Sequence, residues 1–220
     1  MAGVKTPPTR VTILTRGADL TGDLRLPPQA GALVLFAHGS GSSRLSQRNR
    51  FVAEALDRAG LATLLIDLLT PEEEASDSAT AALRFDIPFL ARRLEGVSDW
   101  LRNREKTRPL ALGYFGASTG AAAALTAAAS RPDEIFAVVS RGGRPDLALE
   151  ALPRVKAPTL LIVGGNDAPV IAMNEEASRA LNAEHRLAIV PGATHLFQEP
   201  GALETVARLA ADWFTGHPTK

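Results

Sequence analysis

The stretch Leu112–Leu125 reads LGYFGASTGAAAAL, and Ser118 lies near its centre between Gly116 and Gly120. The residues before the serine form an apolar run typical of a strand, and the alanines after it favour a helix. A strand that turns at once into a helix needs small residues at the junction. Two interpretations follow: a closely packed turn with no chemistry, or a nucleophilic serine held on a strained turn.

Apolar runs and helical spacings alternate on both sides of this junction. We predict strands at Thr9–Leu14, Leu20–Leu26, Ala32–Ala37, Leu61–Ile66, Leu110–Phe115, Ile135–Val139, Thr159–Val163 and Arg186–Val190. We predict helices at Asn49–Ala59, Pro88–Asn103, Thr119–Ser130, Val170–Leu181 and Ala202–Phe214. Strands that alternate with helices predict an α/β fold with a parallel sheet covered on both faces, and the first two strands read as an antiparallel hairpin.

One segment between these elements is polar and acidic. Pro71–Thr80 contains three consecutive glutamates, Glu72 to Glu74, and few apolar residues. We expect it to be an exposed, solvated loop and not a metal site.

The bulk composition narrows the class of protein. A chain of 220 residues fits one domain, residues 1–220, and 45% hydrophobic with 22% charged residues is ordinary for a globular protein. Positive and negative side chains balance at 24 each. Binding to nucleic acid or to a membrane surface is therefore not expected, because both usually require a basic excess.

The chain has no cysteine, which excludes disulfides, a thiolate nucleophile and cysteine-bound metals. The opening residues, MAGVKTPPTR, lack the apolar core of a signal peptide. No apolar run approaches the roughly 20 residues that span a bilayer. We expect a cytoplasmic protein, and the sequence leaves its oligomeric state open.

Polar side chains follow several of the predicted strands, where ligands bind in open parallel sheets. Ser118 follows one strand, Asp167 another and His195 the last. The alternative is that Asp167 and His195 are an ordinary turn residue and a loop residue. Asn166 could also orient a histidine, but an anion stabilises an imidazolium better.

The motif G-x-S-x-G at a strand–helix junction, with Asp and His following in that order, resembles the α/β-hydrolase fold. The resemblance covers nearly the whole chain, and the branch similar to dienelactone hydrolases fits best. The 18 residues from Ser140 to Ala157 lie between two predicted strands, which leaves no room for a large cap domain. Dienelactone hydrolases proper carry a cysteine at the position of Ser118.

The resemblance implies a Ser-His-Asp triad that needs no cofactor and no metal. Ser118 would be the nucleophile and His195 the base that takes its proton. Asp167 would hold the imidazole in one tautomer. A small-molecule ester, thioester or lactone is the implied substrate; the alternatives are a non-catalytic binding module or scaffold, or a cofactor-free perhydrolase.

The same resemblance implies an oxyanion hole made of backbone N–H groups. These are the N–H of Thr119 and one from the Gly39-Ser40 loop. His38 precedes that loop, so it either contacts substrate or organises the loop by hydrogen bonding. The glycines here lack the spacing of a phosphate-binding loop.

Three arginines, Arg84, Arg141 and Arg144, lie near the predicted site. A guanidinium forms a planar fork that fits a carboxylate. We hypothesise that at least one of them binds an anionic group of the substrate. The alternative is that they pair with acids such as Asp86 and Asp146, or face water.

Overall fold

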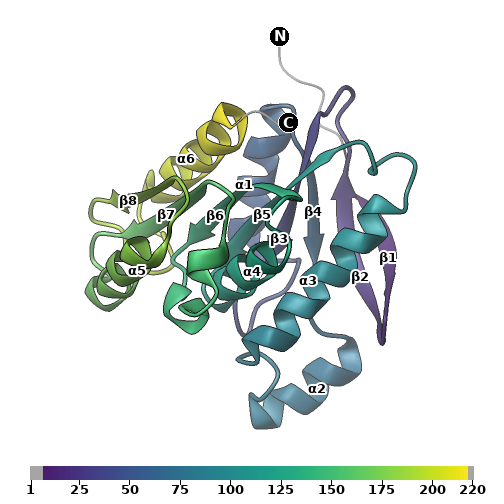
Figure 1. Cartoon of the computed structure of the whole chain (residues 1–220), viewed down its shortest axis with the longest axis horizontal. Coiled ribbons are helices and arrows are strands. Elements are labelled where there is room, and N and C mark those ends of the chain that lie inside the picture. The colour runs from purple at the N-terminus through teal and green to yellow at the C-terminus, as the bar shows by residue number, and fades with distance from the viewer. Residues whose placement is uncertain (1–6, 218–220) are drawn as a thin grey trace.

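A computed structural model describes residues 7–217. The first six residues, on which part of the signal-peptide expectation rests, lie outside this range. An eight-stranded sheet runs through the molecule in the order β1-β2-β4-β3-β5-β6-β7-β8 (Figure 1). Its strands are β1 Thr9–Thr15, β2 Ala18–Arg25, β3 Ala32–Ala37, β4 Ala62–Ile66, β5 Ala111–Ala117, β6 Ile135–Arg141, β7 Thr159–Gly164 and β8 His185–Val190.

The strands from β4 to β8 pair in parallel, whereas β2 pairs antiparallel with both β1 and β4. Helices cover both faces, with α1 and α6 behind the sheet and α3, α4 and α5 in front of it in Figure 1. The helices are α1 Gln47–Arg58, α2 Pro71–Thr80, α3 Ile87–Arg102, α4 Thr119–Ser130, α5 Ala168–Ala180 and α6 Ala202–Gly216. The predicted α/β-hydrolase fold, with its antiparallel N-terminal hairpin, is confirmed.

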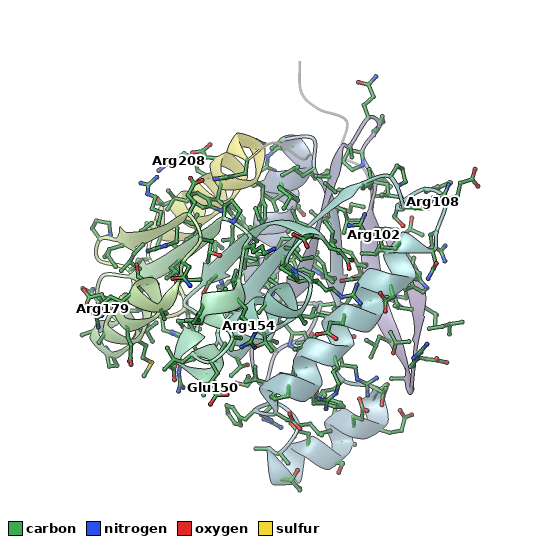
Figure 2. The ribbon with its side chains drawn as sticks, in the orientation of Figure 1. Arg102, Arg108, Glu150, Arg154, Arg179 and Arg208 are labelled. Carbon is green, nitrogen blue, oxygen red and sulfur yellow. The ribbon has the colours of Figure 1, made fainter. Side chains whose placement is uncertain are left out.

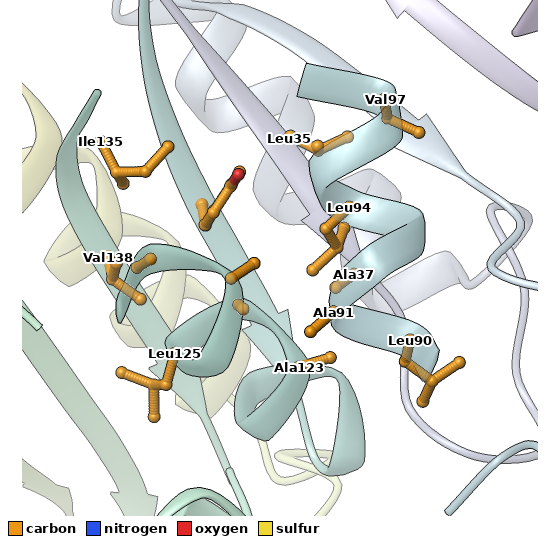
Figure 3. Close-up of a cluster of buried hydrophobic side chains, with 14 of the residues drawn as sticks. Leu35, Ala37, Leu90, Ala91, Leu94, Val97, Ala123, Leu125, Ile135 and Val138 are labelled. Atoms are coloured by element: carbon orange, nitrogen blue, oxygen red, sulfur yellow. The ribbon is translucent and has the colours of Figure 1, made fainter. Parts of the chain in front are cut away.

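Helix α4 lies close against the centre of the sheet. Ala121 to Ala124 are fully buried, and their small side chains let the helix backbone approach the strands. Leucines of α3 and Leu125 of α4 fill the space around them (Figure 3). This packing fixes the start of α4 directly beyond the end of β5.

The segment Pro71–Thr80 is a helix, so the expectation of a loop was wrong. Thr70 caps it: its hydroxyl accepts from the Glu73 N–H, and the Glu73 carboxylate accepts from the Thr70 N–H. Pro71 occupies the first helical position, and the negative charges of the first turn interact favourably with the positive end of the helix dipole. These local signals outweigh the lack of an apolar stripe.

Two further boundaries differ from the prediction in ways that matter for the site. Strand β6 continues through Ser140 and Arg141, so Arg141 belongs to the sheet and not to the loop beyond it. Helix α5 begins at Ala168, with Asp167 as its N-cap. The connection after β6 holds only two short 3₁₀ helices, Pro145–Ala148 and Leu152–Arg154. No helix within residues 7–217 is both long and apolar enough to cross a bilayer.

Candidate active site

Ser118 sits on a strained turn between β5 and α4. Its backbone has φ 51° and ψ −122°, a conformation that L residues rarely adopt. The turn is tight because added Cβ atoms on Gly116 and Gly120 would collide with backbone atoms, among them those of Ala121 and Ala37. This geometry distinguishes Ser118 from an ordinary packing residue.

Asp167 and His195 meet across the ends of β7 and β8. His195 Nδ1 lies 2.7 Å from Asp167 Oδ2. Because an ionised carboxylate can only accept, Nδ1 carries the proton in this pair, which leaves Nε2 of the neutral ring as an acceptor. Asp167 is the N-cap of α5, yet its side chain makes no capping hydrogen bond there. Its carboxylate accepts from His195 instead.

Neighbouring glycines show that Ser118 and His195 border one site. A Cβ on Gly39 would lie 2.9 Å from the Cβ of Ser118, and one on Gly142 would lie 3.5 Å from Nδ1 of His195. The Ser118 N–H donates to the carbonyl of Arg141, the residue before Gly142 (3.2 Å). Within the described residues no hydrogen bond joins Ser118 Oγ to His195; such bonds are often long before substrate binds.

The predicted oxyanion donors lie on the other side of Ser118. The Thr119 N–H is in the first turn of α4, where backbone donors lack an intrahelical acceptor and the helix dipole favours negative charge. The Ser40 N–H already donates to Thr119 Oγ1 (2.9 Å). This bond ties the loop after β3 to α4, and it leaves the Gly39 N–H, adjacent to Ser118, as the second candidate donor in the loop.

His38 is held inside the protein, and both ring nitrogens have backbone partners. Nδ1 donates to the Gly39 carbonyl (2.9 Å), and Nε2 accepts from the Leu68 N–H (3.0 Å). Burial lowers the pKa of His38, although the hydrogen bond to Gly39 and the charge of Asp67 oppose this effect. These two bonds agree with the alternative that His38 organises the loop, and its contact with substrate stays a prediction.

The three candidate arginines have different surroundings. Arg84 pairs with Asp77 through Nε (2.5 Å), and Arg144 forms two hydrogen bonds with Asp146 (2.9 and 2.8 Å). For Arg84 and Arg144 the structure thus shows pairing with an acid, which was the alternative, and their contact with substrate stays a prediction. Arg141 has no acidic partner among the described residues.

A small pocket opens beside the loop after β3. Its lining combines three apolar side chains, Leu68, Leu69 and Leu90, with polar ones that include His38, Glu74 and Arg84. The sequence analysis missed Asp77, which fixes Arg84, because that pairing depends on helix α2, a segment expected to be a loop. Within residues 7–217 no cluster of three or more His, Asp or Glu side chains is arranged to hold a metal ion.

A model of the dienelactone hydrolase family matches residues 24–214. The chain belongs to the dienelactone hydrolase family. A crystal structure of a dienelactone hydrolase from Anabaena variabilis is 59% identical, with a TM-score of 0.96 over 98% of this chain and 100% of that one. Est1E from Butyrivibrio proteoclasticus is 17% identical with a TM-score of 0.80, over 96% and 99% of the two chains, and shares the fold.

Among curated proteins, a "Putative phosphoribosyl transferase" of Mycobacterium tuberculosis is 54% identical over 214 residues. The match covers 96% of this chain but 47% of that protein. This member of the dienelactone hydrolase family therefore spans about half the length of the curated relatives it matches. Family membership favours a hydrolase; it identifies neither the nucleophile nor the bond that is cleaved.

Proposed function

We propose that this protein is a serine hydrolase that cleaves a small ester, thioester or lactone through an acyl-enzyme. The observation that carries the proposal is the Asp167–His195 hydrogen bond of 2.7 Å at the same sheet edge as the strained Ser118. A serine hydroxyl is a weak nucleophile until a base removes its proton, and an oriented histidine is the usual base. The proposal includes a cytoplasmic location and a small-molecule substrate, without nucleic-acid or membrane partners.

The proposed reaction begins when Ser118 Oγ attacks the carbonyl carbon and His195 Nε2 takes the hydroxyl proton. Asp167 stabilises the resulting imidazolium. The N–H groups of Thr119 and Gly39 stabilise the negative charge on the carbonyl oxygen. The imidazolium then protonates the departing alcohol or thiol, which leaves an acyl group on Ser118.

In the second half of the proposed cycle, water replaces the leaving group. His195 takes a proton from the water while its oxygen attacks the acyl carbon of the Ser118 ester. The proton returns to Ser118 Oγ as the carboxylic acid leaves. No step needs a cofactor or a metal.

The experiment is to substitute Ser118→Ala and assay p-nitrophenyl esters of graded chain length, together with lactones. We expect activity to fall by several orders of magnitude, since loss of a triad serine costs on the order of 10⁶-fold in kcat. Circular dichroism controls for folding. Activity above about a tenth of wild type in a folded variant would contradict the role of Ser118.

A fluorophosphonate probe separates this proposal from the alternatives. An enzyme of this type labels at Ser118, whereas a non-catalytic scaffold on the same fold does not. A perhydrolase would label too, and an assay with hydrogen peroxide and a carboxylic acid distinguishes it.

A further inference from the structure

Arg141 is a buried cation without a counter-ion. Its side chain is 8% exposed, and its Nε and Nη1 atoms have no hydrogen-bond partner. Nη2 makes one long contact, 3.4 Å, with the amide oxygen of Asn49, and the guanidinium lies 5.9 Å from the ring centre of Phe197. A buried charge with unpaired donors is costly, and a ligand from outside the chain that accepts from those donors would relieve the cost.

A second arginine adds repulsion to Arg141. Burial lowers the pKa of Arg141, the like charge of Arg48 lowers it to a smaller extent, and together they bring it to about 10. Arg141 is therefore cationic at neutral pH. The Nε of Arg48 is also buried without a partner. Within residues 7–217 neither arginine forms a salt bridge, whereas Arg84 and Arg144 each have an aspartate.

The two arginines meet at the N-terminus of a helix. Arg48 and Asn49 lie in the first turn of α1, whose N-cap is Ser46 and whose first turn contains no acidic residue. Backbone N–H groups in a first turn lack intrahelical acceptors, and the helix dipole is positive there. In α1 the Asn49 N–H donates to the Ser46 hydroxyl (3.3 Å), so the open donors precede it. An arginine at this position is unfavourable for the helix, but a bound anion would reverse the sign of the interaction.

We propose that Arg141, Arg48 and the first turn of α1 form an anion pocket for a carboxylate or phosphate group of the substrate. A planar guanidinium offers paired donors to either group. The pocket adjoins the candidate site, because the Arg141 carbonyl accepts from the Ser118 N–H and Gly142 packs against His195. The assignment of the anion to the substrate rests on the proposed function; the binding itself does not.

The first test measures anion binding without catalysis. Thermal unfolding of wild type and Ser118→Ala is followed with inorganic phosphate or acetate, against chloride at equal ionic strength. We expect both anions to raise the melting temperature, because a ligand that binds only the folded state stabilises it. In Arg141→Met the anion-dependent rise should disappear, and the melting temperature without anion should increase, since removing an isolated buried charge relieves a cost.

Arg208→Gln is the matched control. Arg208 lies on α6 at the edge of the molecule (Figure 2), exposed and paired with Asp212 at 3.3 Å. It should respond to phosphate as wild type does, which separates specific binding from the general stabilising effect of phosphate. Arg48→Gln, a change at a half-buried position, should lose most of the rise in melting temperature that phosphate causes. This variant tests anion binding if Arg141→Met does not fold.

The proposal is overturned if wild type responds to neither anion beyond chloride. It is also overturned if Arg141→Met, or Arg48→Gln in its place, responds as wild type does. Anion binding measured in Ser118→Ala does not depend on catalysis by Ser118. If the serine mechanism fails, the measured anion binding still tests the pocket.

A second test links the pocket to the substrate. Two p-nitrophenyl esters of equal length are compared, one bearing a carboxylate and one neutral. Arg141→Met should lower kcat/KM for the carboxylate-bearing ester about tenfold or more beyond any loss for the neutral ester. Equal changes for both esters would overturn the assignment to substrate. Phosphate should inhibit the anionic ester competitively in wild type.

Discussion

At the level of single residues, glycines decide the shape of the candidate site. Gly120 is the second residue of α4, and a Cβ there would overlap the carbonyl oxygens of Ala37 and His38. Those atoms are backbone and cannot rotate away. The glycine therefore lets α4 approach the loop that carries Gly39, and this approach brings the two sets of candidate oxyanion donors together.

We predict that Gly120→Ala destabilises the protein and disturbs the site. In a helix this change normally stabilises by about 1 kcal/mol, but here overpacking should dominate and cost about 1–3 kcal/mol. Urea unfolding and fluorophosphonate labelling measure the two effects. Gly31→Ala is the control, because a Cβ there meets nothing within 4 Å; an unchanged or raised stability of Gly120→Ala would refute the argument.

His38 gives the second prediction at this scale. Its pKa is lowered in the folded protein by burial, so the unfolded chain binds the proton more readily. Stability should therefore be complete above about pH 6.5 and decline as the pH falls below that value towards the folded pKa. Protonation at Nε2 would also break the hydrogen bond from Leu68.

The measurement compares urea unfolding at pH 8 and pH 5 for wild type and for His38→Gln, which has no titrating ring. The loss between the two pH values should be smaller in the variant. An equal loss in both proteins would assign the acid sensitivity to other groups.

Which single residues could be predicted from the sequence depends on how local their cause is. Ser118, Asp167 and His195 were recognisable because each follows a strand end, and parallel strands bring their carboxyl ends to one edge. The isolation of Arg141 was not recognisable. It depends on β6 being two residues longer than predicted and on which side chains of α1 and of the loop after β8 lie opposite.

At the level of elements, the strands and most helices follow from apolar periodicity, and the parallel sheet follows from their alternation. The strand order, in which β4 lies between β2 and β3, was not predicted. Helix α2 was missed because Asp77 is its only buried residue, so it has no apolar stripe to detect. Its signals lie at its start, in Thr70, Pro71 and Glu73, where side chains satisfy backbone donors that the helix leaves open. A helix of this kind depends on its cap more than on packing.

We therefore predict that Thr70→Ala weakens α2 selectively, by about 1 kcal/mol. Hydrogen exchange of the α2 amides should accelerate while that of α4 stays unchanged. Ser78→Ala, an exposed change within the same helix, is the control and should leave exchange unchanged or slower, since alanine favours helices. Equal protection of α2 in wild type and Thr70→Ala would contradict the role of the cap.

At the level of the whole molecule, charge balance sets how copies interact. The chain has 24 basic and 24 acidic side chains and a pI near 6.9. Most of the ion pairs noted above are local, so the surface carries mixed charge without a large net field. Near pH 7 nothing in the net charge keeps molecules apart, and several large apolar side chains, including Leu14 and Phe85, are exposed.

We predict that attraction between molecules is strongest near pH 6.9 and weakens on either side, since a net charge close to zero promotes association. Static light scattering at low ionic strength, at pH 6, pH 6.9 and pH 8.5, measures the second virial coefficient. The coefficient should be lowest at the middle value, and the contrast should shrink in about 0.15 M salt, where screening acts within about 8 Å. A coefficient that changes in one direction across this range would show that apolar surface contacts outweigh charge.

The proposed anion pocket adds a further expectation to this measurement. Phosphate bound at Arg141 would add negative charge and lower the pH of strongest attraction, whereas chloride at equal ionic strength would not.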